Sequence, residues 1–204
     1  LEIIINFDLI NKKEEKYIFS NNAEGPGGFI DALYYFRKNK NDLYFGNTLT
    51  PSDHTIPNWN KLKKKINNCN INLYYNDIYK IKDINLILNN FTKNKADLVT
   101  CDGGFDFSKN FNEQEKMSYR IILSEIVLIL GSNKIGGSCI IKVFDIFTIF
   151  TIKLIYILST FYNETNFFKP LTSRQANSEK YIVCKGFKGC SVEQINKLKL
   201  LLFN

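Results

Sequence analysis

The stretch KYIFSNNAEGPGGFIDALYYFR, from Lys16 to Arg37, contains the first strand, turn and helix that the sequence predicts. Lys16–Asn22 is typical of a β-strand, and the residues from Phe29 to about Arg37 are typical of a helix. Between them, the turn Glu24-Gly25-Pro26-Gly27-Gly28-Phe29 allows close backbone approach to a ligand at a helix N-terminus. Its spacing is not the G-x-G-x-x-G of dinucleotide-binding proteins, and it lacks the lysine of a P-loop. The turn suits a nucleoside ligand without pyrophosphate; an ordinary glycine turn is the alternative.

Strand-like and helix-like segments alternate along the rest of the chain, which predicts a mostly parallel sheet with helices on both faces. The last two strands are expected to pair antiparallel, and Ser191 with Gln194 forms a capping box that opens the final helix. A length of 204 residues suits one α/β domain, residues 1–204. The other expected strands are Leu43–Gly46, Ile71–Tyr75, Ala96–Cys101, Gly137–Val143, Asn166–Lys169 and Glu179–Lys185, and the other expected helices are Leu1–Leu9, Lys61–Asn67, Ile81–Asn90, Asn112–Leu130 and Phe147–Phe161.

Three charged residues stand at the ends of segments that otherwise resemble buried strands. Asp102 and Lys142 end two such segments, and Glu179 begins a third. Charges are costly to bury without a partner, and ligands of open α/β sheets bind at strand ends. The three residues are therefore candidates for one site, with a structural ion-pair cluster as the alternative.

The formal net charge of +7 is weak evidence for nucleic-acid binding. Only Arg37, Arg120 and Arg174 are arginines among the 27 basic residues, and the abundance of lysine, asparagine and isoleucine matches an A+T-rich coding sequence. The five cysteines form no C-x-x-C pair, so we expect reduced thiols, no metal site and an intracellular protein, cytoplasmic or nuclear. The apolar stretch Ile146–Tyr162 is interrupted by Lys153 and predicts a buried helix rather than a membrane span.

Four blocks of sequence, in the right order along almost the whole chain, resemble the FtsJ-like RNA 2′-O-methyltransferases. The turn Glu24–Phe29 resembles the S-adenosylmethionine-binding turn of this family. Asp97–Asp106 is similar to the fourth strand of its messenger-RNA cap branch, and Gly136–Lys142 to its fifth strand. The block Lys169–Tyr181 is similar to the closing K-P-x-x-S-R-x-x-N-S-E-x-Y pattern. The resemblance implies a Rossmann-like methyltransferase fold with seven strands, one of them antiparallel.

The resemblance also implies roles for individual residues. Asp102, Lys142 and Glu179 match the second, third and fourth positions of the family's catalytic Lys-Asp-Lys-Glu set. The first lysine would lie just before Leu1, so we expect an N-terminally truncated chain with an incomplete set. We expect Lys142 to contact the ribose hydroxyl and act as general base, oriented by the two acids. Expected cofactor-binding residues are Glu24, Gly25, Pro26, Gly27, Gly28, Phe29, Asp77 and Asp102, and expected substrate-binding residues are Ser173, Arg174 and Asn177. A surface-turn role is the alternative for Asp77, and a loop-stabilising role is the alternative for Arg174.

These features favour methyl transfer from S-adenosylmethionine to a ribose 2′-hydroxyl of RNA, with the cap-proximal nucleotide of mRNA as the substrate. Methylation of ribosomal or transfer RNA is one alternative, and a catalytically impaired scaffold or RNA-binding module is another. A nicotinamide-dependent oxidoreductase is disfavoured because the G-x-G-x-x-G spacing is missing. Trp59 and His54 lie in a loop that could face RNA, although a loop-anchoring role is the preferred interpretation for Trp59.

Overall fold

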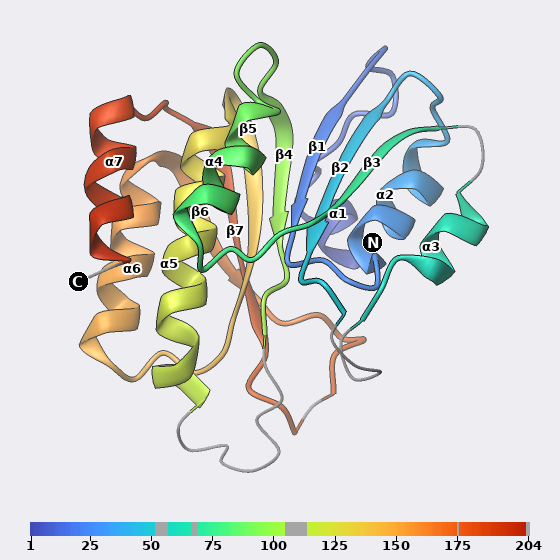
Figure 1. The fold of residues 1–204 in the computed structure, drawn as a ribbon. Coiled ribbons are helices and arrows are strands. Elements are labelled where there is room, and N and C mark those ends of the chain that lie inside the picture. Colours follow the sequence, from blue (N-terminus) through green and yellow to red (C-terminus); the bar gives the residue numbers. More distant parts are fainter. Residues whose placement is uncertain (52–56, 67–68, 105–113, 175, 203–204) are drawn as a thin grey trace.

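Seven strands form one sheet in the order β3-β2-β1-β4-β5-β7-β6 (Figure 1). This computed structural model describes residues 1–51, 57–66, 69–104, 114–174 and 176–202. The neighbouring pairs among β1 to β5 are parallel, and β7 is antiparallel to both β5 and β6. The expected mostly parallel, Rossmann-like sheet with one antiparallel strand is confirmed. The strands are β1 (Ile18–Asn22), β2 (Leu43–Thr48), β3 (Asn70–Tyr75), β4 (Ala96–Cys101), β5 (Asn133–Val143), β6 (Tyr162–Phe168) and β7 (Lys180–Phe187).

Helices cover both faces of the sheet, as the alternating pattern predicts (Figure 1). Successive residues of a strand point to opposite faces, so Ile140 and Ile141 of β5 belong to two different apolar clusters. The cluster of Ile140 includes residues of α1, α2 and α3, and the cluster of Ile141 includes residues of the other four helices. The helices are α1 (Glu2–Asn6), α2 (Gly28–Arg37), α3 (Asn60–Lys65), α4 (Ile81–Asn89), α5 (Gln114–Ser132), α6 (Ile149–Thr160) and α7 (Val192–Leu201).

The glycine turn joins β1 to α2 and is fixed at both ends. The Glu24 amide donates to the Asn47 carbonyl at the end of β2, at 3.0 Å. Gly27 has a φ of 108°, a left-handed conformation that favours glycine. The Glu24 carboxylate accepts hydrogen bonds from the Phe29 and Ile30 amides, which satisfies two donors in the first turn of α2. The turn is therefore held by its own side chain and by the neighbouring strand.

Helix α6 packs on the sheet as expected, but it is buried on one side only. Leu154 and Leu158 pack against the sheet, whereas Phe150 and Tyr156 are 61% and 68% exposed. The helix is apolar on nearly every side, so its sequence does not show which face the sheet covers. No helix in the described part of the chain is both long and apolar enough to cross a membrane.

The capping box at the start of α7 is present as expected. The Ser191 hydroxyl accepts from the Gln194 amide at 3.1 Å, and the Gln194 side chain accepts from the Ser191 amide at 2.9 Å. This reciprocal pair satisfies donors at the helix N-terminus, and so defines where α7 begins.

Candidate active site

The three predicted charged residues stand at strand ends that share one edge of the sheet, the lower edge in Figure 1. Parallel strands β1 to β5 share this edge as their carboxyl end. Because β7 runs antiparallel to β5, its amino end lies at the same edge. Asp102 follows β4, Lys142 is the penultimate residue of β5, and Glu179 precedes β7. The antiparallel strand thus delivers a carboxylate to the edge where Rossmann-like sheets bind ligands.

Lys142 and Asp102 form a close ion pair. The Lys142 Nζ atom lies 3.2 Å from the Asp102 Oδ1 atom, and their side chains are 12% and 32% exposed. A Cβ atom built on Gly104 would lie 3.2 Å from the same Nζ, so the chain after β4 passes directly against the lysine amine. The amine is therefore held between an acid and a glycine backbone at a partly open edge.

Tyr181 connects the two acids of the site. It pairs directly with Lys142 across the antiparallel strands β5 and β7. Its hydroxyl lies 3.2 Å from Glu179 Oε1 and 3.4 Å from Asp102 Oδ1, donating toward both carboxylates. Glu179 is thereby linked to the Lys142–Asp102 pair through a tyrosine that sequence reasoning did not select.

Two buried carboxyl groups lie near the Lys142–Asp102 pair. Glu24 and Glu125 are 1% and 0% exposed, and one carboxyl oxygen of each lacks a hydrogen-bond partner. Burial raises the pKa of Glu24 well above its usual value, and the nearby Asp102 carboxylate raises it further. Burial also raises the pKa of Glu125 to about 8, against the opposing effects of the Gly103 amide and Lys142. Burial therefore favours the protonated form of both groups, and at neutral pH Glu125 is mostly protonated.

The electrostatic balance at Asp102 is set by its neighbours. Burial raises the pKa of Asp102, and the charge of Lys142 opposes this rise most strongly. The Glu179 carboxylate raises the pKa, whereas the Tyr181 hydrogen bond lowers it. Ionisation of Asp102 therefore depends on the partners that the fold places around it.

The glycine turn leaves open space beside the site. A Cβ atom on Gly28, the first residue of α2, would meet no atom within 4 Å. By contrast, a Cβ atom on Gly25 would lie 2.6 Å from the Thr48 hydroxyl, and one on Gly27 would lie 2.6 Å from Leu62. Gly25 and Gly27 are thus required by packing, and Gly28 faces outward together with the exposed Pro26.

Asp77 lies past the end of β3, in the neighbouring loop. The Asn76 amide donates to the Thr48 carbonyl at 2.8 Å, which places this loop beside the end of β2. The Asp77 carboxylate accepts from the Tyr79 amide at 3.0 Å and lies 3.4 Å from the Lys80 amine. Its contacts in this structure are those of a turn residue, and cofactor binding by Asp77 stays a prediction.

The predicted substrate-binding residues lie in the loop between β6 and β7. The Ser173 hydroxyl donates to the Asn177 side chain at 3.2 Å. The Lys169 amine donates to Asn177 Oδ1 at 2.8 Å, to the Asn177 carbonyl at 2.6 Å and to the Glu179 carbonyl at 3.1 Å. Ser173 and Asn177 therefore bind each other and shape the loop that carries Glu179, while Arg174 is exposed. A role for all three in binding RNA stays a prediction.

The model of the FtsJ-like methyltransferase family matches residues 1–187. The chain belongs to this family. The cap-specific mRNA (nucleoside-2′-O-)-methyltransferase 1 of Xenopus laevis is 33% identical over 209 residues, which cover 96% of this chain and 24% of that protein. The Homo sapiens protein of the same name is 32% identical over 191 residues, which cover 87% of this chain and 22% of that protein. The chain thus spans about a quarter of the length of these curated relatives.

Solved structures support the fold of this FtsJ-like methyltransferase. A ribosomal RNA methyltransferase from Plasmodium falciparum matches with a TM-score of 0.68 at 20% identity, covering 93% of this chain and 94% of that chain. Human methyltransferase-like protein 13 in complex with SAH matches with a TM-score of 0.62 at 10% identity, covering 100% of this chain and 90% of that chain. At these identities the likeness establishes the Rossmann-like architecture alone.

The start of α5 holds two loops of the FtsJ-like site together. The Gln114 side chain accepts from the Ser178 hydroxyl, beside Glu179, at 2.8 Å. The Glu115 carboxylate accepts from the Phe147 amide at 3.1 Å and from the Thr148 amide and hydroxyl, each at 2.8 Å. Burial opposes ionisation of Glu115, but these hydrogen bonds outweigh it and hold its pKa below the usual value. The loops after β5 and before β7 are therefore anchored to one helix.

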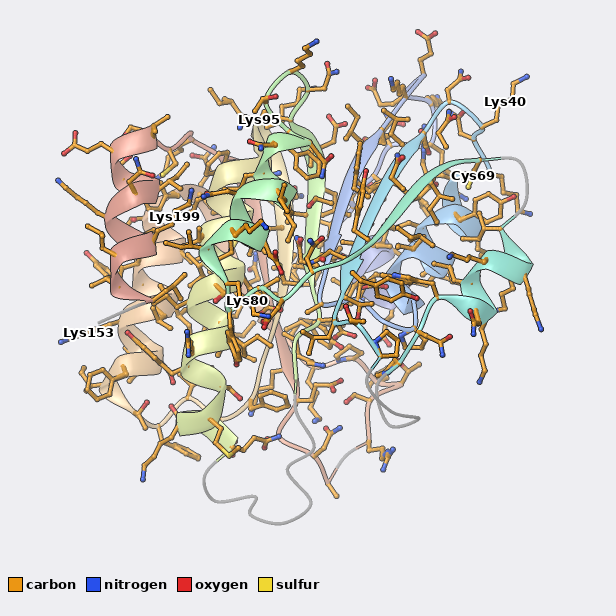
Figure 2. The ribbon with its side chains drawn as sticks, in the orientation of Figure 1. Lys40, Cys69, Lys80, Lys95, Lys153 and Lys199 are labelled. Carbon is orange, nitrogen blue, oxygen red and sulfur yellow. The ribbon has the colours of Figure 1, made fainter. Side chains whose placement is uncertain are left out.

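The remaining sequence predictions concern aromatic and basic residues. Trp59 is fully buried, and its indole donates to the Tyr74 carbonyl at 3.3 Å, so the loop-anchoring interpretation is confirmed. His54, Phe105 and Asp106 lie outside the described residues. Figure 2 shows Lys40, Lys95, Lys153 and Lys199 at well-separated places around the FtsJ-like fold, so these four lysines do not form one basic patch.

Proposed function

We propose that this chain transfers a methyl group from S-adenosylmethionine to a ribose 2′-hydroxyl of RNA, and that its substrate is the cap-proximal nucleotide of mRNA. The single observation that carries the proposal is the Lys142–Asp102 pair, 3.2 Å apart at the carboxyl edge of an FtsJ-like sheet. The cap assignment is supported by the names of relatives about one-third identical to the chain. We also propose that residues 1–204 act as one methyltransferase domain inside the cell.

The residues at the sheet edge fit S-adenosylmethionine as the donor. The open space over Gly28 leaves room for a ligand against the N-terminus of α2. Asp102 and Asp77 follow two strands at the same edge and offer carboxylates to polar groups of a nucleoside. When bound, the sulfonium of the donor supplies an electrophilic methyl carbon, so the reaction requires no metal.

The chain's own residues then orient and deprotonate the acceptor. In its neutral form the Lys142 amine accepts the proton of the 2′-hydroxyl as the oxygen attacks, and returns it to water afterwards. Asp102 fixes the amine through the 3.2 Å contact, and Glu179 is joined to Asp102 through Tyr181. Alignment of the reacting groups supplies a large part of the rate enhancement, because it removes their freedom of movement beforehand.

Replacing Lys142 tests the proposal. We expect Lys142→Ala to lower the rate of methyl transfer by about 100-fold or more, the contribution typical of a general base. Binding of S-adenosylhomocysteine, measured by calorimetry, should change little because the glycine turn is intact. Lys134→Ala is the matched control: it removes another lysine of β5 that pairs with an aspartate of β4, Lys134 Nζ to Asp97 Oδ1 at 3.0 Å.

The substrate is tested with capped and uncapped oligonucleotides of the same sequence, followed by mass spectrometry of nuclease digests. A 2′-O-methyl group on the first nucleotide of capped RNA alone supports the cap assignment. Equal methylation of uncapped RNA would contradict the cap assignment and favour ribosomal or transfer RNA as the substrate. Full activity of Lys142→Ala would exclude the proposed mechanism.

A further inference from the structure

Tyr181 lies at the centre of the site but does not belong to the expected catalytic set. Its side chain is 9% exposed, and its hydroxyl lies between the carboxylates of Asp102 and Glu179. On the other side, its ring contacts the ring of Phe29 edge to face, with 5.9 Å between the centroids. One side chain therefore touches the loop after β4, the residue before β7 and the glycine turn.

The hydroxyl has one proton to share between two acceptors. Its distances of 3.2 Å to Glu179 and 3.4 Å to Asp102 are both long for a hydroxyl donor, as expected when a single proton serves both carboxylates. Burial raises the pKa of Tyr181 far above its usual value, and the two carboxylates raise it further. The hydroxyl consequently stays protonated wherever the enzyme works, and it remains a donor.

Without that proton, two carboxylates would face each other at a partly buried edge. The Glu179 charge raises the pKa of Asp102, so the two acids repel each other. Lys142 is 3.2 Å from Asp102 and compensates that carboxylate directly. The Tyr181 hydroxyl lies within hydrogen-bond distance of both carboxylates, and it fixes their positions relative to each other.

We propose that Tyr181 is a positioning residue for methyl transfer: its hydroxyl joins Asp102 and Glu179 into one unit that orients Lys142, and its ring fixes this unit against the glycine turn. This inference rests on the proposed function of the site. Tyr181 sits opposite Lys142 in the β5–β7 register, so the strand pairing itself places the hydroxyl where both acids can be reached. A phenylalanine would keep the ring contact and lose the link between the acids.

The charged groups around Asp102 define what Tyr181→Phe should change. Loss of the hydroxyl removes a hydrogen bond that lowers the pKa of Asp102, so this pKa should rise. Because Asp102 acts in its ionised form, the variant should lose activity at a higher pH than the wild type. The acid limb of the pH–rate profile should therefore move to higher pH. The other titratable groups near Asp102 are unchanged in the variant, and they are Glu24, Cys101, Glu125, Lys142 and Glu179.

The experiment compares Tyr181→Phe with Tyr162→Phe in the 204-residue chain. Tyr162 is 3% exposed, and its hydroxyl donates to Asn133 Oδ1 at 2.8 Å, at the opposite end of the sheet. It therefore controls for the loss of a buried hydroxyl. Tyr181→Phe should lower kcat about tenfold, the value of a hydrogen bond to a charged group, with KM for S-adenosylmethionine nearly unchanged. The acid limb should move to higher pH in Tyr181→Phe, and Tyr162→Phe should change neither kcat nor the acid limb.

A second measurement does not depend on turnover. The pKa of Asp102 is followed by carbon-13 NMR of aspartate-labelled protein, with its signal assigned by Asp102→Asn. A rise in Tyr181→Phe, absent from Tyr162→Phe, supports the link between the acids. An unchanged pKa together with an unchanged kcat would overturn the inference. If the wild-type chain methylates no RNA, the proposed function fails, and the NMR titration alone still decides whether Tyr181 couples the acids.

Discussion

Glu125 shows how a single buried acid makes the stability of the domain depend on pH. It is fully buried in α5, and its carboxyl group accepts from the Gly103 amide at 2.8 Å, directly after Asp102. In the folded chain its pKa is about 8, whereas in the unfolded chain it lies near the ordinary value of about 4.3. Between those values the folded chain binds one more proton. This extra proton stabilises the folded chain. The stabilisation is fully present below about pH 4.3 and is lost as the pH rises through about 8.

We expect Glu125→Gln to remove this pH dependence. The amide oxygen can still accept from Gly103, but the side chain no longer titrates. The free energy of unfolding of the wild type, measured with urea, should fall relative to the variant as the pH is raised from about 5 to about 8. Glu193→Gln, in the exposed part of α7, is the control and should track the wild type. If the free energy of unfolding depends on pH in the same way in all three proteins, Glu125 is not the source of the pH dependence.

At the residue scale, the sequence was sufficient to predict the charged residues of the site. It was not sufficient to predict the neighbouring residues that hold them in place. Asp102 and Lys142 stood out because a charge at the end of an apolar strand is unusual. Tyr181 did not, because a tyrosine in a strand is ordinary for a half-buried sheet. Glu125 did carry a signal: it stands inside the apolar run from Ile121 to Leu130 of a helix without a polar face. Only the fold shows that the buried acid meets Gly103.

At the element scale, the N-terminus of α2 offers a direct test of cofactor binding. Gly28 is the first residue of α2, and a Cβ atom there would meet no protein atom within 4 Å. Gly28→Ala should leave the free energy of unfolding unchanged or raise it by up to about 1 kcal/mol, because alanine restricts the unfolded chain. The added methyl group would occupy the space assigned to the ligand. Calorimetry should show weaker binding of S-adenosylhomocysteine, by about tenfold or more.

Gly27→Ala separates a ligand effect from a folding effect. Gly27 has a φ of 108° and little space for a Cβ atom, so this substitution should lower the melting temperature. Gly28→Ala should not lower it. If S-adenosylhomocysteine binds Gly28→Ala as tightly as the wild type, the turn does not contact the ligand at this position.

The elements also show where sequence patterns lose information. The strand Ala96–Cys101 has the bounds that its apolar run predicts, because turn residues mark both ends. The predicted strand Asn166–Lys169 begins later than β6, which starts at Tyr162 directly after α6. Exposed polar residues such as Asn163 and Glu164 hide the start of this edge strand, which pairs with β7 on one side only. Strand pairing, rather than local composition, extends it.

At the scale of the whole molecule, a fully buried ion pair lies away from the active site. Arg37 Nε is 2.7 Å from Asp42 Oδ2, and both side chains are fully buried. The same guanidinium donates to the carbonyls of Asn11, Lys12 and Glu14, so it joins α2 and the start of β2 to the segment before β1. This arginine, which stood out in a lysine-rich sequence, has a structural role.

Breaking this pair should destabilise the fold and spare the chemistry. We expect Asp42→Asn to lower the free energy of unfolding by about 3 kcal/mol, because a buried guanidinium loses its charged partner. Asp31→Asn breaks the exposed pair between Asp31 and Lys65, also on α2, and should cost less than about 1 kcal/mol. Urea denaturation measures both values. Methyl transfer per folded molecule should match the wild type, and a loss of activity at full folding would contradict a purely structural role.

The overall topology was predictable from the order of the segments, whereas the strand order was not fully predictable from the residues alone. Alternating strands and helices predict a parallel sheet, and the last two strands were expected to pair with each other. That β7 pairs with β5 on its other edge follows from long-range packing, with Val183 and Ile182 entering the two opposite apolar clusters. Local patterns do not encode which strands become neighbours.

The central place of β7 has a consequence for how the protein is made. This strand is synthesised after both of its neighbours, yet it lies between them. A nascent chain that ends before β7 already contains the glycine turn, Asp102 and Lys142, but lacks the strand that lies between β5 and β6. Glu179 and Tyr181 arrive only with the strand that closes that gap, so the proposed site is complete only when translation has passed this point.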